Sequence, residues 1–326
     1  MTGSPAIVSV GSALLDEQYL VSNLPRPDAG AFVREESVAF GGVAANVAVA
    51  VSRLGHTSGI VARLGNDDIA EMVTSDLHEE GVEIDRLRRS DDERSTYCMV
   101  FRDPDGERTI VTRSGAASAL RLTDDDVSYL RSADVVFANG FCPDDVTRTV
   151  SRLAAEGTIR LAFDLASPLD ALAGRATSRE TVDGLLSEVS LFVANEASIR
   201  SYLGTDGRDA VERLRHRGVR RGALTQGEDG ALLWTDEPDS AVVDVPALDV
   251  DVVDTTGAGD AFVAGLLHRW LLEGDSLQSA AEFATAGAGY NCTEPGARGG
   301  MVSEKRIARL VRDELQQRRD TGTQDS

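Results

Sequence analysis

The chain has 326 residues, with 54 acidic and 33 basic side chains and a formal net charge of −21, and Lys305 is its only lysine. This balance argues against nucleic acid as a partner, because a polyanion is bound by a basic surface. No apolar stretch approaches the eighteen or so residues of a membrane span and no signal segment opens the chain, so we expect a soluble, cytoplasmic protein of one to two domains, without a membrane partner.

The excess of acid together with the single lysine indicates adaptation to salt. Such a surface resembles those of proteins from salt-loving archaea, where high ionic strength screens the repulsion between like charges. A GC-rich genome, which encodes arginine in place of lysine, is the alternative, but it does not supply the acid excess. We therefore expect activity and stability to rise with added KCl.

Neither the cysteines nor the histidines are spaced as metal ligands. The cysteines are too scattered for a disulfide framework or a CxxC site, and we expect three buried thiols: Cys98, Cys142 and Cys292. The histidines are equally dispersed, and surface or helix-cap positions are expected for all four: His56, His78, His216 and His268.

The first part of the chain alternates strands with helices and makes two hairpin excursions. Strands are predicted at 6–10 and 58–64, and helices that end before Gly55 and Gly81. The hairpins are predicted from strands at 18–21, 32–39, 96–101 and 108–112. Together they would build a small β-sheet, for which a movable lid or a dimerising flap is a natural use.

Two segments in the first fifty residues are candidates for binding a ligand. Asp16 follows the first strand, where open α/β sheets bind ligands. Gly41 and Gly42 open the next helix, and paired glycines allow a ligand to approach the backbone closely. Asn46 falls in the first turn of that apolar helix, and its amide needs a partner, which is either a structural group or a ligand hydroxyl.

Beyond residue 134 strands and helices alternate regularly, which predicts a mostly parallel sheet. The predicted strands are 135–138, 160–164, 191–194, 222–225 and 231–234, and the predicted helices are 144–156, 178–188, 208–217, 276–290 and 304–316. Asn195, Thr225, Gly227 and Gly230 follow the carboxyl ends of two of these strands, where α/β sheets place ligands.

The stretch VVDTTGAGDAF at 252–262 carries the most specific chemistry. Its two valines have strand character and an apolar helical pattern follows Asp260, so Gly257, Ala258 and Gly259 lie at a predicted strand-to-helix junction. Free amide groups and the helix dipole favour an anion there. The Asp260 carboxylate would repel a phosphate unless it removes a proton from an attacking hydroxyl. This pattern favours phosphoryl transfer, with a plain helix cap as the alternative.

Two stretches, GGVAANVAVAVSRLG and VVDTTGAGDAFVAG, resemble the signatures of the ribokinase-like, or PfkB, carbohydrate kinase family, in the same order and with a fitting separation. The resemblance covers nearly the whole chain. It implies a three-layer α/β domain with a mostly parallel central sheet flanked by helices, formed by residues 1–16, 40–93 and 115–326. A small β-sheet lid, formed by 17–39 and 94–114, would often carry the contact of a homodimer.

The resemblance also implies roles for the matching positions. Asp260 matches the base that deprotonates a sugar hydroxymethyl as it attacks the γ-phosphate of ATP, and the amides of Gly257, Ala258 and Gly259 match the anion hole. Positions that hold sugar hydroxyls are Asp16, Gly41, Gly42 and Asn46, and nucleotide positions are Asn195, Thr225, Gly227 and Gly230. A monovalent-cation site, suited to K⁺, would comprise Asp254, Thr256, Asn291, Glu294 and Gly296. Mg²⁺ is expected to arrive with the ATP phosphates.

Two positions depart from the family's pattern. Many members read NxxE where this chain has Asn195-Glu196-Ala197-Ser198, so the acid that helps to order Mg²⁺ is replaced by Ser198. Leu14 stands where ribokinases carry an asparagine, which weakens ribose as the substrate and leaves fructose-like sugars, sugar acids or a nucleoside.

We therefore expect an ATP-dependent kinase of a small sugar or sugar acid, with a nucleoside kinase on the same scaffold as the alternative. A catalytically silent binding module is suggested by the missing acid, but retention of Asp260 and the glycines argues against it. A dinucleotide-dependent oxidoreductase is disfavoured because no GxGxxG follows the first strand.

Overall fold

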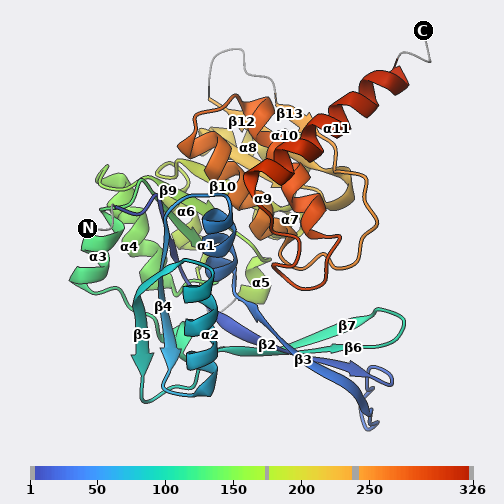
Figure 1. The fold of residues 1–326 in the computed structure, drawn as a ribbon. Helices are drawn as coiled ribbons and strands as arrows, with labels where there is room; N and C mark the ends of the chain where they lie inside the picture. Colours follow the sequence, from blue (N-terminus) through green and yellow to red (C-terminus); the bar gives the residue numbers. More distant parts are fainter. Residues whose placement is uncertain (1–3, 173–175, 237–241, 323–326) are drawn as a thin grey trace.

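The computed structural model describes residues 4–172, 176–236 and 242–322. Across these residues the strands form two separate sheets, one of nine strands and one of four. Helices gather around the larger sheet, and the smaller sheet projects away from it (Figure 1). The expected α/β fold, with a mostly parallel central sheet between helices and a small second sheet, is confirmed.

The larger sheet has the strand order β13-β12-β11-β10-β9-β8-β1-β4-β5, and among its described strands only β12 runs antiparallel to its neighbours, which are β11 and β13. Its strands are β1 Ile7–Val10, β4 Ser58–Gly65, β5 Glu83–Ser90, β8 Val135–Asn139, β9 Leu161–Asp164, β10 Leu191–Asn195, β11 Arg221–Thr225, β12 Ala231–Thr235 and β13 Val243–Val245. Every residue of β1, β8 and β9 is buried, because helices cover both faces of a parallel sheet.

Two layers of helices sandwich this sheet. Strand side chains alternate between the faces, so that Val136 joins one apolar cluster while Val135 and Phe137 join the other. The first cluster includes α3 Asp124–Leu130, α4 Asp144–Ala155, α6 Arg179–Leu185, α7 Glu196–Leu203 and α8 Gly207–His216. The second includes α1 Val43–Arg53, α9 Ala258–Leu266, α10 Leu277–Asn291 and α11 Glu304–Gly322, and α2 Asp68–Glu79 packs beside α1.

The smaller sheet has the order β3-β2-β6-β7 and is made by the two predicted hairpin excursions. Its strands are β2 Leu14–Val21, β3 Val33–Gly41, β6 Tyr97–Arg102 and β7 Arg108–Arg113. β2 pairs with β3 in antiparallel and with β6 in parallel fashion. Asp16 therefore lies inside a strand of this sheet, opposite Cys98 and Ala39, and not in a loop after β1.

Some local predictions were wrong. Val252 and Val253 form no strand: they lie in an extended loop before α9 and are 62% and 56% exposed, since no neighbouring strand pairs with them. Several elements were not predicted, namely β5, β13, α3, α5 Leu169–Leu172, the 3₁₀ turns η1 Gly115–Ala119 and η2 Gly227–Asp229, and the π-helical segment η3 Leu267–Leu272 that continues α9. Within the described residues, no helix combines the length and apolar character needed to cross a bilayer.

Candidate active site

Asp260 lies in the first turn of α9, directly after a glycine turn. Gly257 is the N-cap residue of this helix and has φ of 76°, a left-handed conformation that glycine adopts without strain. A Cβ at this position would overlap the carbonyl oxygen of Ala297, so close packing also requires glycine. The Ala258 amide makes a long 3.3 Å hydrogen bond to Thr255. Because the first amide groups of a helix lack acceptors within it, the turn is suited to an anion.

A chain of buried polar side chains holds the Asp260 carboxylate. Asn46, in the first turn of α1, donates from Nδ2 to Asp260 Oδ2 over 2.7 Å. The Asn46 Oδ1 accepts from Arg298 Nε over 2.7 Å, and Arg298 donates from Nη1 to Asp76 Oδ2 over 2.6 Å. Asn46 was expected to meet either a structural group or a ligand hydroxyl. The structure gives its amide structural partners on both sides.

The paired glycines before α1 permit a close approach of two chain segments. Gly42 is the N-cap of α1 with φ of 99°, and a Cβ there would overlap the carbonyl oxygen of Ser12. A Cβ on Gly41 would meet the Asp16 carboxylate oxygen at 2.6 Å. Because these glycines have no side chains, the segments pack closely, and Asp16 of β2 and Asn46 of α1 line the same cavity.

Burial dominates the electrostatics of the site. It raises the pKa of Asp260 to about 7, against the hydrogen bond from Asn46 and the charge of Arg298, which both lower it. Burial also raises the pKa of Asp16 above its ordinary value. At the end of β9, burial and the charge of Asp260 raise the pKa of Asp164 to about 7. Two interacting carboxyl groups poised near neutral pH are typical of sites that transfer protons.

A cavity of about 430 Å³ is lined by Asp260, Asn46 and Asp16. Both sheets contribute to it, since Cys98 and Ile110 of the smaller sheet line the same space as the glycine turn before α9. Its walls are largely apolar and include Leu14, Val43, Ile110, Phe141 and Leu172. No arginine or lysine occurs among the described residues that line it. Its volume suits a small organic molecule.

Known proteins resemble this chain over nearly its whole length. The family model described as pfkB family carbohydrate kinase matches residues 4–304. The chain belongs to this family. The kinase is 29% identical to the ATP-dependent ribose-1-phosphate kinase of Halopiger xanaduensis, over 91% of its own chain and 95% of that protein. It is 28% identical to fructokinase-1 of Zea mays, over 95% and 98% of the two chains.

Among solved structures, the kinase resembles the ribokinase of Arabidopsis thaliana complexed with ribose and ATP. The TM-score is 0.82 at 26% sequence identity, and the likeness covers 94% of this chain and 99% of that chain. The predicted membership of the PfkB family and the predicted carbohydrate kinase activity are confirmed by the family match. The kinase is therefore a sugar kinase of the ribokinase-like fold.

Hydrogen bonds link the residues of the loop that was predicted to hold a monovalent cation. Asp254 Oδ1 accepts from the amide and hydroxyl of Thr256 over 2.9 and 2.6 Å, and its Oδ2 accepts from the Gly296 amide over 3.0 Å. Asn291 Nδ2 donates to the carbonyl oxygens of Thr256 and Ala297 over 3.0 and 3.2 Å. Although burial acts to raise it, these hydrogen bonds hold the pKa of Asp254 below its ordinary value.

An arginine of the smaller sheet contacts this loop. Arg108 of β7 donates from Nη1 to the Thr256 hydroxyl over 2.7 Å, and the same nitrogen lies 3.6 Å from Asp254 Oδ1. Glu294, the remaining predicted member of the cation site, is exposed and makes no side-chain hydrogen bond within the described residues. Arg108 thus links the smaller sheet to the turn that precedes Asp260.

The predicted nucleotide positions lie at the carboxyl ends of neighbouring strands. Asn195 of β10 and Thr225 of β11 are register partners. Asn195 Oδ1 caps α7 by accepting from the amide and hydroxyl of Ser198 over 2.8 and 2.7 Å, and its Nδ2 donates to the Ala166 carbonyl over 3.0 Å. Gly227 and Gly230 follow β11 at η2 and its end. None of the four predicted positions lines the cavity around Asp260.

The residues around the missing acid are engaged elsewhere. Ser198 is fully buried against Asn195, and Glu196 pairs with Arg200 over 3.1 Å on the surface of α7. Both side chains are therefore engaged in contacts within or beside α7.

Asp164, Arg298 and Arg108 are among the charged residues at the site that were not predicted. Asp164 carries a usable signal, because an acid directly at the end of a buried strand is the pattern that singled out Asp16. Arg298 and Arg108 carry none, because their partners lie 148 to 252 residues away in the sequence.

Proposed function

We propose that this kinase transfers the γ-phosphate of ATP to a primary hydroxyl of a small sugar or sugar acid of the fructose, ribose or ketodeoxygluconate class, with Asp260 as general base. The observation that carries the proposal is the position of Asp260, buried beside a glycine turn and lining a 430 Å³ cavity. Relatives named ribose-1-phosphate kinase, fructokinase and ribokinase support this class of acceptor.

In the proposed reaction the sugar hydroxyl oxygen attacks the γ-phosphorus, the bond from phosphorus to the bridging oxygen breaks, and ADP leaves. Asp260 takes the hydroxyl proton, and its pKa of about 7 leaves it ionised above neutral pH yet basic enough to do so. Asn46 and Arg298 orient the carboxylate. The amides of Gly257, Ala258 and Gly259 stabilise charge on the transferred group.

We infer that ATP and Mg²⁺ are the cofactors. The helix N-terminus at Gly257 suits a phosphate, and Mg²⁺ would arrive with the ATP phosphates. Mg²⁺ neutralises phosphate charge when it is bound. The rest of the nucleotide is assigned to the strand-end positions Asn195, Thr225, Gly227 and Gly230, since parallel sheets bind ligands at that edge. The ribokinase of Arabidopsis thaliana, a relative in fold and sequence, was solved with ribose and ATP.

We also propose that K⁺ binds in the loop beside the anion turn, with Asp254, Thr256, Asn291, Glu294 and Gly296. The Asp254 carboxylate has a lowered pKa and stays ionised at neutral pH, so it can attract a cation. The nearby carbonyl oxygens of the loop add the hard ligands that such an ion requires. Because Arg108 brings positive charge to the same carboxylate, we expect its contact to weaken when K⁺ binds.

We propose that the smaller sheet acts as a lid on the cavity and that two chains pair through it. Its strands line the cavity, and together with Phe32, which directly precedes β3, they carry five of the nine large apolar side chains that are exposed among the described residues: Phe32, Val33, Val38, Ile110 and Val111. A patch of this kind is typical of an interface. Analytical ultracentrifugation tests the pairing. The wild type should sediment as a dimer and the Val38→Asp variant as a monomer. A wild type that is monomeric at all concentrations would contradict the proposal.

A nucleoside kinase is the second candidate, favoured by the apolar walls of the cavity, which would accept a base. A coupled ADP-release screen of fructose, ribose, ribose 1-phosphate, sugar acids and nucleosides separates the candidates. The same screen compares uncharged sugars with sugar acids and sugar phosphates as acceptors. Turnover of nucleosides alone would select the second candidate, and no turnover of any acceptor would contradict both.

A further inference from the structure

Helices α1 and α9 are joined at both ends by side-chain contacts. Their N-terminal turns meet through Asn46 and Asp260. At the other end, His56 follows α1 and His268 lies in the π-helical segment Leu267–Leu272 that continues α9. Glu273 follows this segment, and its amide donates to the His268 carbonyl over 3.0 Å. Residues 212 positions apart are thus neighbours at the end remote from Asp260.

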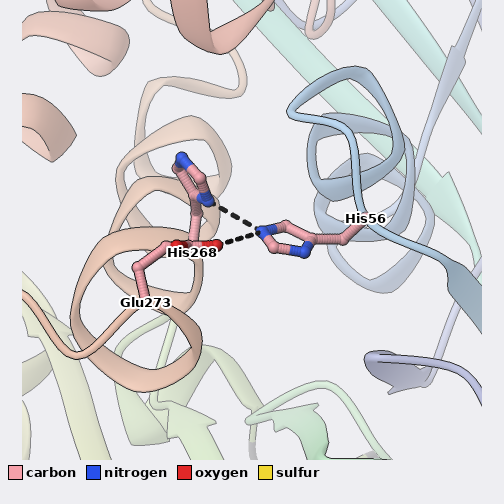
Figure 2. A group of neighbouring side chains, drawn as sticks. All are labelled: His56, His268 and Glu273. Atoms are coloured by element: carbon pink, nitrogen blue, oxygen red, sulfur yellow. Dashed lines mark hydrogen bonds and ion pairs between the residues drawn. The ribbon is translucent and has the colours of Figure 1, made fainter.

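The three side chains direct their ligand atoms toward one point, as Figure 2 shows. His56 Nε2 lies 2.7 Å from His268 Nδ1 and 3.9 Å from Glu273 Oε1. All three atoms lie within 4.8 Å of one another. Within the described part of the chain, no other group of histidine, cysteine and carboxylate side chains converges in this way.

The surroundings of His268 leave one ring nitrogen available at this point. His268 is only 2% exposed. Its Nε2 has no hydrogen-bond partner in the described residues and lies 3.9 Å from Glu304 Oε1. A proton on Nε2 faces that carboxylate favourably, so Nδ1 presents its lone pair to His56. Ligating histidines commonly face a carboxylate with their second nitrogen in this manner.

We propose that His56 Nε2, His268 Nδ1 and the Glu273 carboxylate bind a divalent transition metal ion of the Zn²⁺ class, with water as the fourth ligand. Two imidazole nitrogens and one carboxylate oxygen are a donor set that Zn²⁺ accepts and that Mg²⁺ and Ca²⁺ do not favour. This site is separate from the proposed nucleotide, sugar and K⁺ sites.

Small movements bring the three groups to bonding distance. Tetrahedral Zn²⁺ with bonds of about 2.0 to 2.1 Å separates two nitrogens by roughly 3.3 Å, so the histidine pair opens by about 0.6 Å from its present 2.7 Å. The Glu273 side chain is 49% exposed and free to approach. The charged groups around the site are Glu273, Glu304 and Arg269, and Arg269 is paired with Asp275 over 2.7 Å. The net charge of these groups is negative, which favours the binding of a cation.

The bound ion clamps the C-terminal ends of α1 and α9 together. Its expected effect is therefore on stability, because the ion lies at the end of these helices opposite to Asp260. An ion that binds only the folded protein stabilises it by mass action. With Zn²⁺ at about a hundredfold excess over its Kd, we expect Tm to rise by about 5 °C.

The test uses the full chain, with any affinity tag removed and metal stripped by EDTA. Titration with Zn²⁺ alone by calorimetry should give one ion per chain, and Co²⁺ should produce the visible absorption of a tetrahedral site. His56→Asn should abolish this binding, and Glu273→Gln should weaken it by about 10- to 100-fold. His216→Asn, a change at an exposed histidine of α8, is the matched control and should bind as the wild type does.

Equal Zn²⁺ affinity in wild type, His56→Asn and Glu273→Gln would overturn the proposal, as would a Tm that Zn²⁺ leaves unchanged. Both histidine substitutions are at partly or fully exposed positions, so loss of folding does not obscure the result. None of these readouts depends on kinase turnover, and the outcome is therefore independent of the proposed function.

Discussion

Replacing Asp260 by asparagine separates the proposed base from the rest of the site. Asparagine has nearly the same shape and keeps an oxygen that can accept the 2.7 Å hydrogen bond from Asn46, so the glycine turn and the cavity should persist. It does not take up a proton at neutral pH. Loss of a general base should lower kcat by roughly 10²- to 10⁴-fold, with a much smaller change in ATP affinity.

The same substitution should stabilise the fold at neutral pH. The pKa of Asp260 is about 7 in the folded protein against an ordinary value of 3.8, so between these values the folded state keeps a proton that the unfolded chain has released. The contribution of Asp260 to the free energy of unfolding is thus most favourable below pH of about 4 and declines as the pH rises to about 7, by roughly 4 kcal/mol. Asparagine removes this decline.

Two assays check the prediction. Coupled ADP-release kinetics should show wild-type kcat/KM rising with pH through about 7, and this rise should be absent from the variant. Denaturant unfolding at pH 5 and pH 8 should show a stability gain in the variant that is larger at pH 8. Asp244→Asn, a change at an exposed acid of β13, serves as the control and should alter neither property. Near-full turnover in the Asp260→Asn variant would refute the role of base.

Three further outcomes follow from the site. Gly257→Ala should destabilise the protein by about 1 to 3 kcal/mol and abolish measurable turnover, because its Cβ meets the Ala297 carbonyl; wild-type turnover and denaturant midpoint would contradict this. Arg108→Gln should raise the sugar KM several-fold, because it removes the contact between the smaller sheet and Thr256. The effect on Tm should be small, since an exposed contact contributes about 1 kcal/mol or less. An unchanged KM would show that Arg108 has no role in lid closure. Activity and Tm should both rise with KCl into the molar range, and equimolar NaCl should restore Tm but not full activity; full activity in dilute buffer would refute salt adaptation.

The fold could be predicted from the sequence where patterns are local. The apolar runs of β1, β8 and β9 and the helical spacing after Gly42 and Gly257 were sufficient, because burial on both sides demands continuous apolar strands. Val252 and Val253 show the limit of this reasoning. Two β-branched residues favour an extended backbone, but a strand also needs a partner, and none lies beside them.

Some residues of the candidate site could be chosen from the sequence, whereas the contacts between them could not. Asp260, Asn46 and Asp16 were chosen for their places next to glycines and strand ends, and they line one cavity. The hydrogen bond between Asn46 and Asp260 joins residues 214 positions apart, so no local sequence pattern predicts it. The hydrogen bond from Arg298 to Asn46 is equally unpredictable, for the same reason. The dispersed histidines were interpreted as surface or cap residues, whereas packing of α1 against α9 buries His268 and brings His56 to it.

The central claim, that the kinase activates a primary hydroxyl of a small sugar, is tested most directly by turnover of paired acceptors. ADP release is measured in high KCl with each sugar that the screen identifies and with its analogue that lacks only the primary hydroxyl. We predict sugar-dependent ADP release with the parent sugar and none above background with the deoxy analogue. Equal release with the two, or release with neither, would contradict the account.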